Sequence, residues 1–194
     1  LLREELREVE RYAAVLEAIA EGRTAGSDVA AFAGVGERAL QYYLAGLVGL
    51  GYVRKRYPLS EQSPPTRHVR LGIDDPLLRF WFRFVFPNTS YLAQRGAEVV
   101  FRDRIRPQLD AHFGQGFEHL CREALPFLYA RERVSGAFRV GEYWNKDCQI
   151  DVVGLGDDSF VDLGECKWGA RQETASAVQE LEGKMQYFPN RRNA

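Results

Sequence analysis

QIDVV at residues 149–153 and DLGECKW at residues 162–168 decide the fold of the C-terminal part of this chain. Both stretches read as strands, and the glycines and aspartates between them favour a hairpin. Side chains alternate between the two faces of a strand, so Glu165 and Lys167 point the same way. The hairpin can bring Asp151 beside them. We therefore expect two carboxylates and one ammonium group to share a small site.

A site of this kind favours a divalent cation. Carboxylates crowded between strands repel one another and lose hydration unless a cation joins them. Mg²⁺ or Mn²⁺ suits carboxylate oxygens, and Mg²⁺ keeps several waters for chemistry. With Asp151 and Glu165 as metal ligands, the cation would polarise a phosphodiester and acidify a bound water, while Lys167 neutralises phosphate charge. The alternative interpretation is an Asp151–Lys167 ion pair across the strands, with Glu165 at an edge.

The order Asp151, a spacer, and Glu165-Cys166-Lys167 resembles the core of the PD-(D/E)xK nuclease superfamily, which has the restriction-endonuclease-like fold. In that superfamily an acid often lies on the helix before the sheet, and Glu118 matches this position. The resemblance implies catalytic roles for Asp151, Glu165, Lys167 and Glu118, with Glu118 as an outer metal ligand or water-holder. Cys166 alternates with its neighbours, so we expect a packed small side chain rather than a nucleophile.

Residues 75–88, DPLLRFWFRFVFPN, resemble the linker of archaeal-type AAA ATPases that end in a restriction-endonuclease-like domain. The resemblance implies the ATPase domain of a parent protein as a partner. The chain has no Gly-rich phosphate loop ending in Gly-Lys-Ser/Thr, so we expect no ATPase activity from it. Gln149 replaces an acid that is often found just before the strand aspartate. Because the chain lacks a starting methionine and ends soon after Phe188, where the family usually adds a strand, we interpret it as a fragment, truncated at its C-terminus.

The composition is that of a globular protein, with 194 residues, 45% hydrophobic and 27% charged. No apolar run is long enough to span a bilayer and no secretion signal is present, so we expect a cytoplasmic protein without a membrane partner. The net charge of -1 gives no general support for nucleic-acid binding. Three cysteines without paired spacing indicate neither a disulfide framework nor a zinc site.

Residues 1–73 have the pattern of a winged helix-turn-helix domain. Three helical stretches with apolar stripes precede two strand-like pieces at 52–57 and 66–71. In such a domain the third helix enters the major groove and the two strands contact phosphates. The expected DNA contacts are outward residues of the third helix and basic residues of the strands: Arg38, Gln41, Tyr42, Arg54, Lys55, Arg56, Arg67 and Arg70. A protein-docking module is the alternative, because the third helix is only weakly basic.

Residues 74–115 are predicted to form a helical linker. An aspartate cap followed by Pro76 starts a helix, and a run of aromatic residues follows until Pro87 ends it. So many aromatics in a short run predict a packed core rather than a base-stacking surface. Residues 116–194 are predicted to be the nuclease-like domain, with a helix, strands and a covering helix at 113–131, 137–144, 149–155, 160–168 and 174–188.

The predicted fold class is therefore α+β / α/β, with an N-terminal winged helix-turn-helix, a helical linker and a C-terminal restriction-endonuclease-like mixed sheet flanked by helices. The predicted function is DNA binding and Mg²⁺-dependent phosphodiester cleavage by a fragment of an AAA-type ATPase. A catalytically inactive DNA- or protein-docking scaffold of that ATPase is the alternative. A transcriptional regulator is a third possibility, but it would need dimerisation and a basic recognition helix, and the sequence shows neither clearly.

Overall fold

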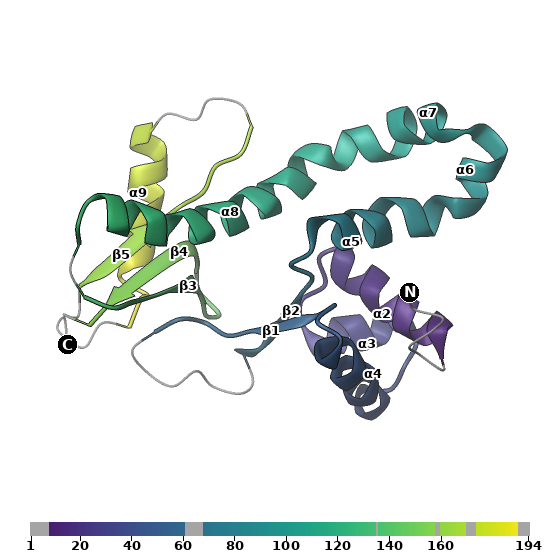
Figure 1. Cartoon of the computed structure of the whole chain (residues 1–194), viewed down its shortest axis with the longest axis horizontal. Coiled ribbons are helices and arrows are strands. Elements are labelled where there is room, and N and C mark those ends of the chain that lie inside the picture. Colours follow the sequence, from purple (N-terminus) through teal and green to yellow (C-terminus); the bar gives the residue numbers. More distant parts are fainter. Residues whose placement is uncertain (1–7, 61–67, 135, 158–159, 170–173, 190–194) are drawn as a thin grey trace. The chain divides into compact units, whose positions relative to one another are not determined.

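A computed structural model describes residues 8–60, 68–134, 136–157, 160–169 and 174–189 of the chain (Figure 1). It confirms a mixed α+β protein with helices and small antiparallel sheets. The chain forms two compact units. The first comprises Leu1–Arg56 and Val69–Pro107, and the second comprises Tyr57–His68 and Gln108–Ala194. The segment expected as a linker is thus divided between the two units at Pro107.

Three helices and a short hairpin begin the first unit: α2 (Val9–Ala20), α3 (Gly26–Ala33), α4 (Glu37–Gly49), β1 (Arg54–Arg56) and β2 (Arg70–Gly72). The apolar stripes of the helices meet in a core that includes the fully buried Val15, Leu16, Val29 and Leu47. Gly34 ends α3 in the left-handed conformation, with φ 61°, which glycine adopts without steric cost. β1 and β2 pair in antiparallel fashion, with Lys55 opposite Leu71. Leu71 is buried, so the hairpin packs onto the helices.

The rest of the first unit is helical and irregular. α5 (Pro76–Phe80) starts as expected, because the Asp75 carboxylate accepts a hydrogen bond from the Leu78 amide at 2.7 Å. The prediction that Pro87 ends the helix is wrong. A π-helical turn (Trp81–Val85) and a 3₁₀ turn (Phe86–Asn88) accommodate the proline, which lacks an N–H group, and α6 (Thr89–Arg95) follows directly. Phe82 and Phe84 are buried at 2% and 1% exposure, as expected for a packed core, whereas Trp81 is 47% exposed.

The same succession occurs a second time. After α7 (Ala97–Val100) come a π-helical turn (Phe101–Ile105) and a 3₁₀ turn (Arg106–Gln108) that again contains a proline, Pro107. The 3₁₀ turn runs directly into α8. Proline inside a helical stretch therefore has the same local consequence in both places: the hydrogen-bond pattern changes but the chain keeps winding.

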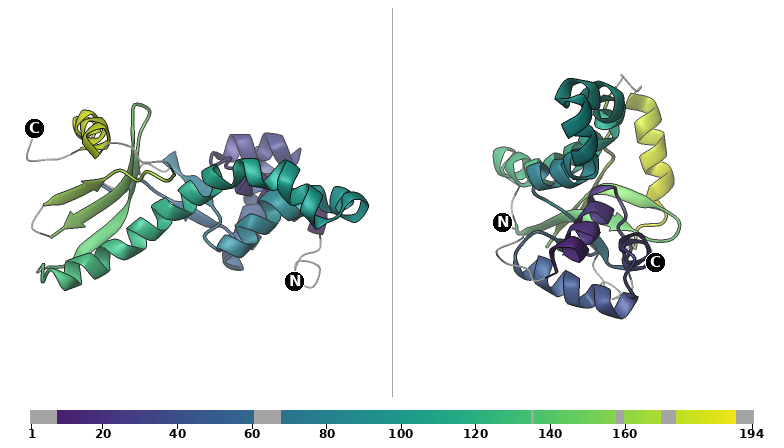
Figure 2. Two further views of the ribbon diagram at one scale, coloured as in Figure 1. Left: turned by 90° about the horizontal axis from the view of Figure 1, so that it is seen from above. Right: turned by 90° about the vertical axis from the view of Figure 1, so that its right-hand side faces the viewer.

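In its described residues the second unit has a three-stranded antiparallel sheet between two helices (Figure 2). Its elements are α8 (Leu109–Arg131), β3 (Phe138–Trp144), β4 (Gln149–Gly156), β5 (Val161–Gly164) and α9 (Thr174–Met185), with strand order β3-β4-β5. Ile150 and Val153 pack with Leu181 of α9. Gly154 faces α8 instead, because a Cβ added there would lie 2.0 Å from the Tyr129 hydroxyl. In the described part of the chain, every helix is too short or too polar to cross a membrane.

β4 contains a bulge at its centre. Gly141 pairs with Val153, and Tyr143 pairs with Ile150, so β4 has one residue more than β3 between these two pairs. Two residues of β4, Asp151 and Val152, therefore lie opposite Glu142 of β3. Bulges of this kind turn a side chain away from the direction that regular alternation would give it.

Candidate functional site

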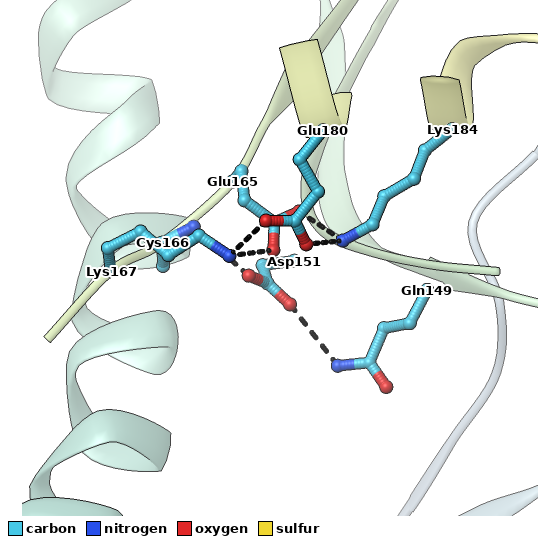
Figure 3. Close-up of polar contacts among 7 residues, drawn as sticks. All are labelled: Gln149, Asp151, Glu165, Cys166, Lys167, Glu180 and Lys184. Carbon is cyan, nitrogen blue, oxygen red and sulfur yellow. Dashed lines mark hydrogen bonds and ion pairs between the residues drawn. The ribbon is translucent and has the colours of Figure 1, made fainter. Parts of the chain in front are cut away.

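Asp151 lies in the bulge of β4 and is only 6% exposed. Its backbone carbonyl accepts a hydrogen bond from Nη1 of Arg122, on α8, at 2.8 Å. Its carboxylate accepts one bond from the Cys166 amide at 3.0 Å and another from Nε2 of Gln149 at 3.2 Å (Figure 3). The carbonyl and the carboxylate of this residue therefore both accept hydrogen bonds from outside the regular strand pairing. The carboxylate lies against the backbone between Glu165 and Lys167.

Glu165 follows β5 rather than lying inside a strand. The last regular pair of the β4–β5 ladder is Val152 with Gly164, so the prediction of a strand that continues to Trp168 is wrong. Hydrogen bonds between residues far apart in the chain replace regular pairing here. The amide of Cys166 donates to the Asp151 side chain, and the Asp151 carbonyl is bound by Arg122.

Four side chains form what we call the ion-pair network: Glu165, Lys167, Glu180 and Lys184. Nζ of Lys167 lies 3.0 Å from Glu165 and 2.7 Å from Glu180, and Nζ of Lys184 lies 2.7 Å and 2.9 Å from the same two carboxylates. The side chains converge from the segment after β5 and from α9 (Figure 3). Glu165 is 7% exposed at its side chain, and it is therefore the buried member that both lysines neutralise.

The charges of the network reinforce one another. Hydrogen bonds from Lys167 and Lys184 lower the pKa of Glu180 to about 2. The hydrogen bond to Glu180, followed by the one to Glu165, raises the pKa of Lys167, although desolvation acts in the opposite direction. Burial would lower the pKa of Lys184, but the same two carboxylates outweigh it and raise the pKa. Both lysines are ammonium ions at neutral pH, so they act by charge and not as bases.

Cys166 lies towards α8, which carries Glu118, whereas Glu165 and Lys167 reach towards α9. Burial, and then a hydrogen bond with Cys121 of α8, raises the pKa of the Cys166 thiol. The expectation of a packed thiol instead of a nucleophile therefore agrees with its surroundings. Glu118, also on α8, is one of the charges that act on Cys166, whereas Glu165 is bound by Lys184 of α9. Among the described residues, no three His, Cys, Asp or Glu side chains are grouped so as to hold a metal ion.

Apart from Arg67, the residues expected to contact DNA lie in the first unit. Those of α4 are all exposed: Arg38, Gln41 and Tyr42. The hairpin brings Arg56 directly opposite Arg70, and Lys55 lies beside them and is exposed. Arg54 pairs with Asp74 at 2.7 Å, so its charge is partly compensated. Arg67 lies outside the described residues.

Sequence reasoning missed three residues of the site. Glu180 and Lys184 lie one helical turn apart on α9, and this spacing indicates an ion pair on a helix but not its third and fourth partners. No sequence pattern identifies Arg122, because a side chain that binds a backbone carbonyl on a distant strand has no fixed spacing in the sequence.

Comparisons with known proteins give one family and one relative. Residues 81–178, about half of the chain, match DUF234, a family of archaeal and bacterial proteins of unknown function. The chain is 27% identical over 170 residues to an uncharacterized protein, MJECL04, of Methanocaldococcus jannaschii. The match covers 87% of this chain and 38% of that protein, so the chain spans less than two fifths of its relative's length. No solved structure matches the chain.

Proposed function

Because the chain belongs to the DUF234 family, whose function is unknown, we propose a function from its own side chains: metal-assisted cleavage of DNA phosphodiester bonds by the second unit. The observation that carries the proposal is the position of the Asp151 carboxylate, 3.0 Å from the Cys166 amide and thus between Glu165 and Lys167. The proposal assigns the second unit to the restriction-endonuclease-like fold and the first to the winged helix-turn-helix fold.

The donor set suits Mg²⁺ or Mn²⁺. Asp151 and Glu165 supply two nearly buried carboxylates, at 6% exposure of the residue and 7% of the side chain. Mg²⁺ in phosphoryl-transfer sites is commonly held by one or two carboxylates together with waters and substrate phosphates, so a third protein acid is not required. When bound, the cation would polarise the phosphodiester and acidify a water. Glu118 would act as an outer ligand or water-holder.

The ion-pair network provides the electrostatic complement. Lys167 is an ammonium ion at neutral pH, so it can neutralise the charge of a phosphate that approaches Asp151 and Glu165. Lys184 keeps a partner if Glu165 turns towards a cation, because Glu180 lies 2.9 Å from it. The network can therefore release Glu165 without leaving a lysine unpaired.

In this proposal the first unit holds the DNA. α4 offers the exposed Arg38, Gln41 and Tyr42 to the major groove, and the hairpin offers Lys55, Arg56 and Arg70 to phosphates. Basic groups in phosphate contact release counterions, so affinity for duplex DNA falls as salt rises. We further propose that the chain acts beside the ATPase domain of a longer parent protein.

A nicking assay on supercoiled plasmid tests the cleavage. The wild type is expected to cleave with Mg²⁺ or Mn²⁺ and to be inactive in EDTA. Asp151→Ala and Lys167→Ala are expected to lower the rate by roughly 100-fold or more, the usual cost of removing a group that stabilises transition-state charge. Glu182→Ala, an exposed acid on α9, is the matched control and keeps the wild-type rate. Equal residual cleavage in all four proteins would end the proposal.

A docking scaffold is the second candidate, and the ion pairs of Glu165 favour it. A buried carboxylate neutralised by two lysines is a stable structural element without any metal. Thermal melting under a divalent-metal titration separates the two functions. A ligand that binds only the native state stabilises it by about 2.7 kcal/mol at a concentration 100 times its Kd. Stabilisation that disappears in Asp151→Ala supports the metal site, and no stabilisation of the wild type supports the scaffold.

A further inference from the structure

Three aromatic rings lie directly beyond the candidate site. The Trp168 ring lies 5.7 Å from the rings of both Phe113 and Phe117 on α8, tilted by 56° and 52°. The Cβ of Trp168 lies 3.8 Å from the position that a Cβ on Gly114 would take, so the residue rests on the helix. Trp168 follows Lys167 in the chain. The indole is therefore attached to the backbone that carries two of the site's charged groups.

Trp168 is held in place but not covered. It is 49% exposed, and Phe113 is 46% exposed. By comparison, Phe82 and Phe84 of the first unit are 2% and 1% exposed, which is typical of aromatics that serve a core. Two neighbouring rings fix the tilt of the indole while half of its area stays in water. Covering a fixed aromatic surface costs little conformational entropy, so such a ring is suited to stacking with another flat group.

The flat groups nearest to a phosphodiester are nucleobases. Inside a duplex each base already has neighbours stacked on both faces, so away from the duplex ends only an unpaired base can offer a face to an indole. Lys167 reaches towards Glu180 of α9 and Trp168 rests on α8, while their Cα atoms are only about 3.80 Å apart. A nucleotide whose phosphate lies at this segment can therefore extend its own base or the next one towards Trp168. Stacking needs no particular base, because every base has a π face.

The geometry points to Trp168, supported by Phe113 and Phe117, as a stacking platform for an unpaired base next to the scissile phosphate. The substrate class is then DNA that carries a single-stranded segment, such as an overhang or a flap, rather than continuous duplex. This inference rests on the proposed function of the same site, since it is the phosphate at Asp151, Glu165 and Lys167 that brings a base to the indole.

Binding of fluorescently labelled DNA in EDTA tests the platform without relying on cleavage. Two probes share one duplex, and one of them carries a single-stranded overhang. Trp168→Ala is expected to weaken binding of the overhang probe by roughly 5- to 150-fold, the effect of losing one stacked base, and to leave the blunt probe unchanged. Trp168→Phe, which keeps a ring, is expected to lose less.

Trp81→Ala is the matched control, because Trp81 is 47% exposed but lies in the first unit. It is expected to bind both probes like the wild type. Thermal melting of every variant shows that the second unit stays folded. Equal binding of the overhang probe by the wild type and Trp168→Ala would overturn the inference, and so would equal losses on both probes.

The nicking assay distinguishes this inference from the proposed function. If overhang binding depends on Trp168 but plasmid cleavage does not depend on Asp151, the cleavage proposal fails and the platform stands. If cleavage depends on Asp151 and metal but Trp168→Ala binds the overhang normally, the platform fails and the cleavage proposal stands.

Discussion

Replacing Glu180 by Gln removes one carboxylate from the ion-pair network and keeps the size of the side chain. Glu180 accepts from Lys167 at 2.7 Å and from Lys184 at 2.9 Å, so both lysines lose one of their two partners. Glu165 keeps both ion pairs. We expect the variant to fold, with a lower free energy of unfolding at neutral pH.

The magnitude follows from the pKa of Glu180. A shift from 4.5 to about 2 corresponds at face value to about 3 kcal/mol, since one pKa unit equals about 1.36 kcal/mol. The side chain is 45% exposed, however, and solvent screens such pairs so strongly that each contributes about 0.2–1 kcal/mol. We therefore expect the variant to be less stable by about 1 kcal/mol.

The difference in unfolding free energy depends on pH, and the lowered pKa of Glu180 determines the direction of this dependence. Because the pKa of Glu180 is lower in the folded state than its usual 4.5, its contribution is fully present above pH 4.5 and disappears as the pH falls towards about 2. Urea unfolding of the wild type and Glu180→Gln, repeated from neutral to acidic pH, measures the difference. Glu182→Gln, two residues along α9 and exposed, is the control and should match the wild type throughout. A difference that persists unchanged at low pH, or that Glu182→Gln reproduces, would refute the reasoning.

Two further predictions concern the packing of α8 on the sheet. Gly154→Ala places a Cβ 2.0 Å from the Tyr129 hydroxyl and should lower the free energy of unfolding by about 1–3 kcal/mol. The Cβ of Gly183→Ala on α9 meets nothing within 4 Å, so this variant should be more stable than the wild type by about 0.5–1 kcal/mol. Urea unfolding of both variants checks these opposite signs. Arg122→Met removes the hydrogen bond to the Asp151 carbonyl and should lower the free energy of unfolding by about 1–3 kcal/mol. Arg131→Met changes an exposed position of the same helix and should lower it by less than about 0.5 kcal/mol. Thermal melting of both variants compares them.

The regular elements were predictable because their signals are local. Strand β4 was expected at 149–155 and lies at Gln149–Gly156, and the covering helix was expected to begin at residue 174, where α9 begins. Period-two alternation and turn residues are sufficient for such assignments. The helix end at Pro87 was predicted wrongly, because a proline can also be accommodated by a change to π and 3₁₀ turns.

The sequence could predict that the site residues lie near one another, but not how their hydrogen bonds arrange them. Alternation places Glu165 and Lys167 on one face, and the structure joins them by an ion pair of 3.0 Å. No pattern in the sequence shows that β4 has a bulge at Asp151 and Val152, or that the ladder ends at Gly164. Both features depend on hydrogen bonds between residues far apart in the chain, which period-two reasoning does not include.

Arg122 lies where these two features meet, because its guanidinium group binds the carbonyl of Asp151, a residue of the bulge. The Cys166 amide, just beyond the end of β5, donates to the carboxylate of the same residue. These two hydrogen bonds hold the backbone and the side chain of Asp151 from different elements, and they keep its carboxylate beside Glu165 and Lys167. The chemistry proposed for the second unit therefore depends on a guanidinium group of α8 that binds the Asp151 backbone, as well as on the residues that carry the charges of the site.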